Sequence, residues 1–118
     1  HHMAYTEKFQ ALAEQACSQV DSITPADVDA LILSGAVALD IRDKEEHDAG
    51  HIEGSLHVSR GTLEMNIEGQ IPDLDTTVLC YCNAVNRGAL SAATLKSMGY
   101  RNAKFIDGGL NGYRSTHS

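Results

Sequence analysis

The feature that most constrains the fold is a pair of strand-length segments, 36–41 and 76–82, that are dominated by apolar residues without alternation. A strand with one face in water alternates apolar and polar side chains, whereas a strand buried on both faces is mostly apolar. Strands of the second kind occur mainly in parallel sheets that carry helices on both faces. The two segments therefore predict the inner strands of a parallel sheet.

The rest of the chain alternates between helical and extended patterns with short connections. Between Thr6 and Val20 apolar residues recur every three or four positions, which predicts an amphipathic helix capped by Thr6. Thr24 and Pro25 suit a cap and a first helical residue, so we expect a second helix that stops at Gly35. This order predicts an α/β fold, with a central parallel five-stranded sheet flanked by helices on both faces. Further helices are expected at 44–49, 63–67, 87–98 and after Gly108-Gly109, and further strands at 22–24, 56–58 and 103–106.

Size and charge narrow the class of protein. A chain of 118 residues suits one core rather than two, and His1-His2-Met3 resembles the end of an affinity tag before a start methionine. There is no export signal or membrane-length apolar run, and three cysteines suit a reducing compartment, so we expect a cytoplasmic protein.

The formal net charge of −7 repels phosphate backbones and anionic lipid. Neither nucleic acid nor membrane is therefore expected as a partner.

Ligands of parallel α/β sheets bind beyond the carboxyl ends of the strands. The residues at those ends are Arg42, Ser59-Arg60, Cys82 and Asp107. An anionic substrate needs local positive charge there, because the protein as a whole is negative. Arg60 is the best placed candidate for substrate binding, and Arg42 is a second one.

Cys82 ends the second apolar segment, and a helix is predicted to begin five residues later, at Arg87 and Gly88. A connection this short can wrap its backbone N–H groups around the sulfur, and the N-terminus of the helix points to the same place. Both effects favour the thiolate, which is the nucleophilic form of cysteine. Cys82 is therefore predicted to be a reactive thiol, in a loop formed by Asn83, Ala84, Val85, Asn86, Arg87 and Gly88.

Several motifs follow one another in the sequence between about Ile23 and Tyr113. They are Leu39-Asp40-Ile41-Arg42 followed by Glu46-His47, Ala49-Gly50-His51-Ile52-Glu53-Gly54-Ser55, the Tyr81-Cys82 loop closing on Arg87, and Asp107-Gly108-Gly109. In this order the motifs resemble the rhodanese homology domain, the sulfurtransferase family in which a loop cysteine cycles between thiol and persulfide. The expected organisation is a tag remnant at 1–3, an N-terminal helix packed on the domain at 4–22, and a rhodanese-like domain at 23–118.

The resemblance implies a three-layer rhodanese-like fold and an enzyme of the thiosulfate sulfurtransferase type. Cys82 would take a sulfane sulfur from a small anionic donor such as thiosulfate, or from a persulfide. It would then pass the sulfur to cyanide or to a thiol, free or on a partner protein. No metal and no organic cofactor are required. The resemblance also suggests that Glu46 braces the loop through a bidentate pair with Arg87, and Asp40 is expected to pair with Arg42.

Two other functions stay open. Related phosphatases of the cell-cycle dual-specificity type place five residues between cysteine and arginine, whereas Cys82 and Arg87 enclose four. Four residues, and the absence of Lys or Arg among them, argue against a phosphatase or an arsenate reductase. A non-catalytic module that binds a partner protein is the other alternative.

Three positions depart from the family's pattern. Val85 stands where the loop commonly has glycine, and a β-branched residue is strained wherever φ is positive. We expect Asn83 and Asn86 to absorb the curvature, because asparagine tolerates that region. Gly88 replaces a common serine and removes a hydroxyl donor, and Tyr113 stands where tryptophan is frequent, which affects packing.

The remaining cysteines and the histidines have structural explanations. Cys80 lies on the same strand face as Cys82, about 7 Å away, near or beyond the limit for a relaxed disulfide. We assign Cys80 to the core and Cys17 to helix packing. His47 and His51 have the spacing of a metal-ligand pair, but a glycine interrupts the helix and no third ligand is apparent, so no metal site is predicted.

The three thiols should differ in their reactivity toward an alkylating agent. Limiting iodoacetamide at neutral pH should label Cys82 before Cys80 and Cys17, because only its loop stabilises a thiolate. Peptide mass spectrometry measures the order of labelling. Cys80→Ser and Cys17→Ser should keep the fast site, and faster labelling of Cys17 than of Cys82 would contradict the assignment.

Overall fold

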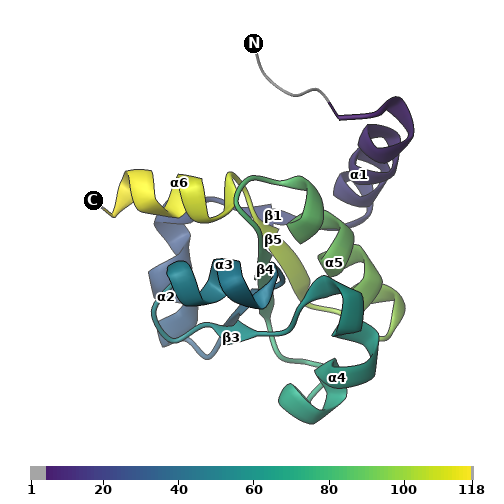
Figure 1. Cartoon of the computed structure of the whole chain (residues 1–118). Helices are drawn as coiled ribbons and strands as arrows, with labels where there is room; N and C mark the ends of the chain where they lie inside the picture. Colours follow the sequence, from purple (N-terminus) through teal and green to yellow (C-terminus); the bar gives the residue numbers. More distant parts are fainter. Residues whose placement is uncertain (1–4, 118) are drawn as a thin grey trace.

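The computed structural model, which describes residues 5–117, has the predicted architecture (Figure 1). A five-stranded sheet has the strand order β1-β5-β4-β2-β3, and every neighbouring pair is parallel. The expectation of a tag at His1-His2-Met3 lies outside the described residues. The strands are β1 (Ser22–Ile23), β2 (Val37–Asp40), β3 (Leu56–His57), β4 (Val78–Tyr81) and β5 (Ala103–Ile106).

Helices cover both faces of the sheet, with α1, α4 and α5 on one side and α2 and α6 on the other, whereas α3 has no buried residue (Figure 1). Two single 3₁₀ turns, η1 and η2, precede α2 and α4. None of the helices within residues 5–117 is long and apolar enough to cross a bilayer. The elements are α1 (Glu7–Gln19), η1 (Pro25–Asp27), α2 (Val28–Leu33), α3 (Lys44–Ala49), η2 (Arg60–Thr62), α4 (Leu63–Gln70), α5 (Asn86–Ser97) and α6 (Gly109–Thr116).

One helix is longer than the sequence indicates. The apolar pattern predicts a helix at 63–67, whereas α4 runs to Gln70. The buried residues of α4 are Leu63 and Ile67, and the last turn is exposed and polar. That turn is closed by the Ile71 N–H, which donates to the Ile67 carbonyl at 2.7 Å. Backbone hydrogen bonds can extend a helix through polar residues that show no amphipathic pattern in the sequence. This explains why α4 is longer than the pattern predicts.

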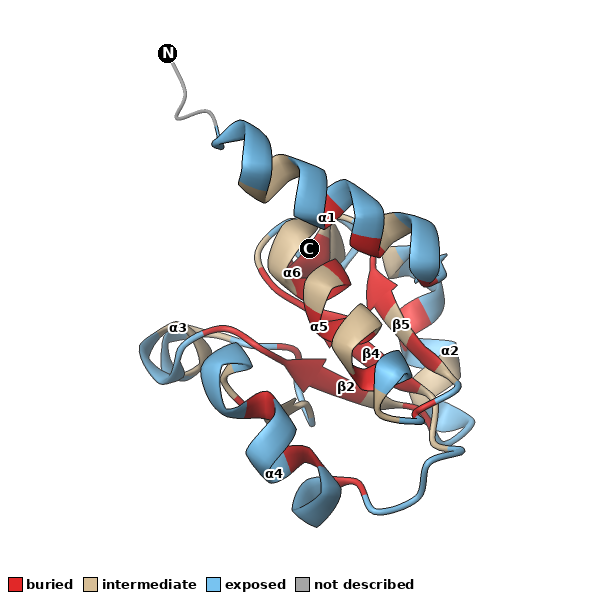
Figure 2. Ribbon diagram, turned by 90° about the vertical axis from the view of Figure 1, so that its right-hand side faces the viewer, coloured by how far each residue is buried: buried red, intermediate tan, exposed pale blue. Residues whose placement is uncertain are grey.

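Strand β4 divides its side chains between the two halves of the core, as expected of a strand buried on both faces. Cys80 and Cys82 belong to the cluster beneath α1, α4 and α5, which confirms that they share a face. Leu79 and Tyr81 belong to the opposite cluster, together with residues of α2 and α6. The sheet is correspondingly buried while the outer sides of the helices are exposed (Figure 2).

The N-terminal helix α1 packs along α5 (Figure 1). Its contact face is made of small residues, since Ala13 and Ala16 are 0% and 4% exposed. Small side chains let two helices approach closely. Thr6 caps the helix by accepting from the Phe9 N–H at 3.3 Å, as the sequence predicts.

The start of α6 is held against the loop that follows β4. The N–H groups of Leu110 and Asn111 donate to the carbonyls of Cys82 and Asn83 at 2.8 and 3.1 Å. This approach requires Gly109, which has a φ of +56°. A Cβ there would clash with the carbonyl oxygens of Cys82 and Ala84. The Gly108-Gly109 pair therefore fixes the loop from the side of β5.

Replacing Gly109 by alanine should destabilise the protein. The positive φ and the clash with two backbone carbonyls predict a loss of about 2 to 3 kcal/mol in the free energy of unfolding. Denaturant unfolding followed by circular dichroism measures it. Gly69→Ala in α4 is the matched control, because a Cβ there meets nothing within 4 Å and alanine suits a helix better. Equal stability of Gly109→Ala and wild type would show that Gly109 does not lie tightly against the carbonyls of the cysteine loop.

Candidate active site

The carboxyl ends of β2 and β4 lie side by side, because Asp40 pairs in register with Tyr81. Cys82 follows β4 directly and is 3% exposed. The Gly88 N–H, in the first turn of α5, donates to the Cys82 sulfur at 3.4 Å. The sulfur therefore lies at the N-terminus of a helix, where backbone N–H groups and the helix dipole stabilise negative charge.

The loop turns without any left-handed residue. Val85 is the N-cap of α5 with a φ of −126°, so its β-branched side chain is not strained by a positive φ. In residues 5–117 only glycines have positive φ. The expectation that Asn83 and Asn86 adopt that region to absorb the curvature is therefore wrong. The hydrogen bonds from α6 to the loop carbonyls help to hold the turn.

Gly88 has a packing role that the sequence analysis missed. A Cβ at this position would lie 3.3 Å from the Tyr81 Cα and 3.4 Å from the Cys82 nitrogen. The bare backbone lets the first turn of α5 approach the end of β4 and direct its N–H at the sulfur. A glycine just inside a helix that follows a buried strand is the sequence signal that could have indicated this close approach.

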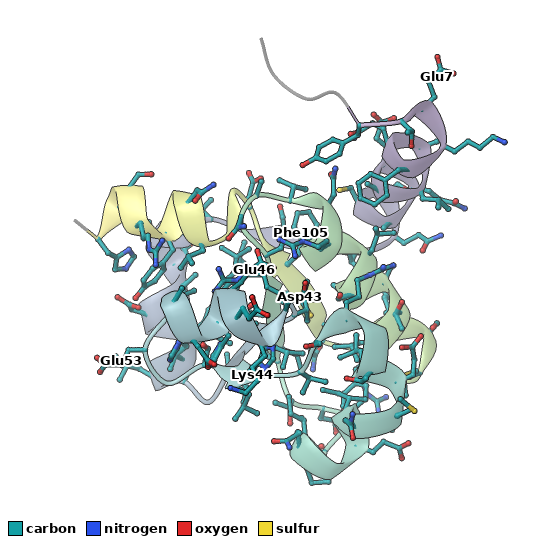
Figure 3. The ribbon with its side chains drawn as sticks, in the orientation of Figure 1. Glu7, Asp43, Lys44, Glu46, Glu53 and Phe105 are labelled. Carbon is teal, nitrogen blue, oxygen red and sulfur yellow. The ribbon has the colours of Figure 1, made fainter. Side chains whose placement is uncertain are left out.

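The Glu46 carboxylate, on α3, braces the loop through the Arg87 guanidinium, which belongs to the first turn of α5. Glu46 accepts two hydrogen bonds from Arg87, at 2.9 and 3.1 Å, in the bidentate arrangement that the sequence predicts. It also accepts from the Asn83 amide at 3.0 Å and belongs to a capping box with Asp43 at the start of α3 (Figure 3). The hydrogen bond from Arg87 is the main reason that the pKa of Glu46 falls to about 2.

Arg42 extends this bracing into the sheet. Its guanidinium is buried and donates to Asp40 at 2.9 and 2.7 Å, to the Gly50 carbonyl at 2.7 Å and to the Asn83 side chain at 3.0 Å. Burial alone would raise the pKa of Asp40, but the hydrogen bonds from Arg42 and His47 outweigh it and lower that pKa. Arg42 is thus positioned to hold the loop, and a substrate contact from it stays a prediction.

A pocket of about 190 Å³ opens at Cys82. Tyr5 and Phe9 form one side of it, and sequence reasoning missed them, since no local pattern links them to a cysteine so distant in the chain. Arg60, the predicted substrate-binding residue, is exposed in η2 and is not among the lining residues, so its role stays a prediction. The pocket is lined by Tyr5, Phe9, Cys82, Asn83, Ala84, Val85, Asn86 and Arg87.

Cys17, Cys80, His47 and His51 lie outside this pocket. Cys80 is fully buried in β4, and burial raises its pKa. Burial also raises the pKa of Cys17, with smaller effects from Asp107 and Glu14. The His47 and His51 rings stack at 3.8 Å, with one nitrogen of His47 bonded to Asp40. In the described part of the chain, no three His, Cys, Asp or Glu side chains are grouped to hold a metal ion.

The fold and this site define a parallel α/β domain with a cysteine loop at the carboxyl edge of its sheet. Residues 24–116 match the rhodanese-like domain family. The chain is 37% identical over 100 residues to the thiosulfate sulfurtransferase GlpE of Pseudomonas entomophila, covering 85% of this chain and 90% of that protein. The same enzyme of Pseudomonas fluorescens is 37% identical over 99 residues, covering 84% and 89%. The chain therefore belongs to the rhodanese family, and it is a sulfurtransferase of the rhodanese type.

Solved structures agree on the fold. A Rhodopseudomonas palustris protein of unknown function, described as a possible tyrosine phosphatase, superposes with a TM-score of 0.84 at 32% identity and covers 100% of this chain and 97% of its own. A human single-domain sulfurtransferase has a TM-score of 0.74 at 22% identity, over 84% of this chain and 99% of its own. At this lower identity, the human protein shows a shared fold only.

Removing the Glu46 carboxylate should loosen the loop. The side chains of Glu46 and Arg87 are 31% and 35% exposed, so solvent screens the pair. We therefore expect Glu46→Gln to cost about 1 to 2 kcal/mol, less than the loss of a fully buried pair, and to lower sulfur transfer as well. Thermal melting and turnover measure the two effects, with the exposed neighbour Glu45 as the control in Glu45→Gln.

The same pair sets a pH dependence. Because the folded-state pKa of Glu46 is depressed to about 2, its stabilisation is complete above its ordinary pKa, near 4.3, and is lost as the pH falls toward 2. The difference in stability between wild type and Glu46→Gln should therefore shrink over this range. A constant difference, or equal melting and turnover at pH 7, would show that the pair contributes nothing.

Proposed function

We propose that this protein transfers a sulfane sulfur through a persulfide on Cys82. The observation that carries the proposal is the Gly88 N–H bond to the Cys82 sulfur at the N-terminus of α5, beside an open pocket. Backbone donors at a helix N-terminus favour a thiolate, and they favour a persulfide anion in the same way. The Gly88 N–H then stabilises the charge in both resting forms of the enzyme.

The proposed reaction has two displacements. The Cys82 thiolate attacks the outer sulfur of thiosulfate, the donor for which the Pseudomonas relatives are named. A bond forms between the two sulfurs, the S–S bond of thiosulfate breaks, and sulfite leaves with its electron pair. Cyanide or an acceptor thiolate then attacks the terminal sulfur of the persulfide, and Cys82 leaves as a thiolate. Thiocyanate or an acceptor persulfide is the product, and ping-pong kinetics follow.

Sulfur fits this loop better than phosphate. A phosphatase must surround a tetrahedral oxyanion with donors and positive charge. Here four residues separate Cys82 from Arg87, and the Arg87 guanidinium is already bonded to both oxygens of Glu46. These features favour a sulfur atom on the cysteine over the phosphatase activity suggested for the Rhodopseudomonas palustris protein.

Mass spectrometry of the intact protein tests the persulfide. Thiosulfate should add the mass of one sulfur atom to wild type, and cyanide should remove it with release of thiocyanate. Cys82→Ser should do neither, whereas Cys80→Ser and Cys17→Ser should do both, because neither thiol lies in the loop. Loading that persists in Cys82→Ser would move the site elsewhere. Absence of loading in wild type, from any donor, would favour a non-catalytic binding module, and hydrolysis of a phosphotyrosine substrate would favour the phosphatase.

A further inference from the structure

The pocket at Cys82 is not built by the matched family domain alone. The family match begins at residue 24, yet Tyr5 and Phe9 line this pocket from the chain before it. Their rings are 5.3 Å apart and inclined by 57°, the tilted geometry of a packed aromatic pair. Ala84 and Val85 supply further apolar lining from the loop. An aromatic wall, Tyr5 and Phe9, thus stands beside the reactive sulfur.

Helix α1, which carries Phe9 and follows Tyr5, is fixed along its length. Near its start, the Asn86 amide at the beginning of α5 donates to the Gln10 side chain at 3.5 Å. Near its end, the Lys96 ammonium donates to the Gln19 carbonyl at 3.1 Å. Phe9 is half-buried and Tyr5 is 59% exposed, so the wall runs from the interior of the pocket to its mouth.

The pocket offers little to a doubly charged substrate. Among its described lining residues Arg87 has the one positively charged side chain, and Glu46 neutralises it through two hydrogen bonds. A thiosulfate dianion would therefore bind through backbone and amide donors in a protein whose net charge is −7. An apolar body would gain from leaving water against the aromatic wall and Val85. The volume of about 190 Å³ is sufficient for one ring, since an apolar cavity of about 150 Å³ holds benzene.

We propose that the aromatic wall selects sulfur donors that carry the sulfane sulfur on an aromatic or similarly apolar group with at most one negative charge. Phe9 and Tyr5 are then specificity-determining residues. The proposal rests on the Cys82 persulfide proposed above. With an arenethiosulfonate, the Cys82 thiolate attacks the sulfane sulfur, the S–S bond breaks, and an arenesulfinate leaves with the electron pair. The acceptor step is unchanged.

Three donors separate the effect of the ring from the effect of charge. Benzenethiosulfonate and methanethiosulfonate each carry one negative charge and release a sulfinate, so they differ in the ring, whereas thiosulfate carries two charges. We expect kcat/KM, measured as thiocyanate release with cyanide as acceptor, to be at least about tenfold higher for benzenethiosulfonate than for methanethiosulfonate. Thiosulfate should have the lowest value of the three.

Variants of the wall give the decisive comparison. Phe9→Ala and Tyr5→Ala should each lower the ratio of kcat/KM for benzenethiosulfonate to kcat/KM for methanethiosulfonate, by about three- to tenfold. Each donor has its own intrinsic reactivity, which a substitution in the protein does not alter. A change in the ratio between wild type and a variant therefore measures the contribution of the aromatic wall. Leu12→Ala is the control, because Leu12 is exposed on the same helix but borders the groove between α1 and α5 instead.

The outcomes distinguish this inference from the proposed function. Loading from thiosulfate with an unchanged donor ratio in both wall variants would overturn the aromatic selection and leave the persulfide intact. An equal fall of the ratio in Leu12→Ala would also overturn it. Absence of loading from all three donors in wild type would instead refute the persulfide itself. Circular dichroism checks folding, and Phe9→Leu, which keeps apolar volume without the ring, replaces Phe9→Ala if the alanine variant unfolds.

Discussion

The site depends on a chain of charged hydrogen bonds that begins in the sheet. Asp40 ends β2 fully buried, and its charge is matched by the buried guanidinium of Arg42. Arg42 reaches Asn83, and Asn83 reaches Glu46, which holds Arg87 at the start of α5. A buried charge is costly unless it is paired and bonded, so each member holds its neighbour in one place. The cysteine loop is thereby fixed by the strand beside it.

This network also explains the electrostatic character of the pocket. An arginine next to a nucleophilic sulfur would ordinarily attract anions. Here the bidentate bond to Glu46 neutralises the charge of Arg87 and holds the loop instead. What remains for a substrate is the Gly88 N–H at the sulfur, the side-chain amides of Asn83 and Asn86, and the aromatic and aliphatic carbon of the other lining residues. The bracing that holds the loop in place therefore also reduces the attraction for a highly charged donor.

Much of the fold and part of the site were accessible from the sequence. The alternation of apolar strands with helices, and the order of motifs from Asp40 to Gly109, are sufficient to indicate the sheet and the family. The Glu46 pair with Arg87 was anticipated as well. Arg42 and Arg60 were placed at the correct edge of the sheet, but sequence could not tell which guanidinium is buried. The sequence also could not show that the backbone of the cysteine loop turns without any left-handed residue.

The sequence by itself determined the parallel sheet, the family and the position of Cys82 before a helix, because these follow from local patterns along the chain. Only the tertiary structure decided what surrounds the sulfur. Asn86 donates a hydrogen bond to Gln10, which is 76 positions away in the sequence. Phe9 lies beside the cysteine loop because small alanines let α1 pack closely on α5. Contacts of this kind depend on how two distant surfaces pack, and no periodicity in either segment encodes them.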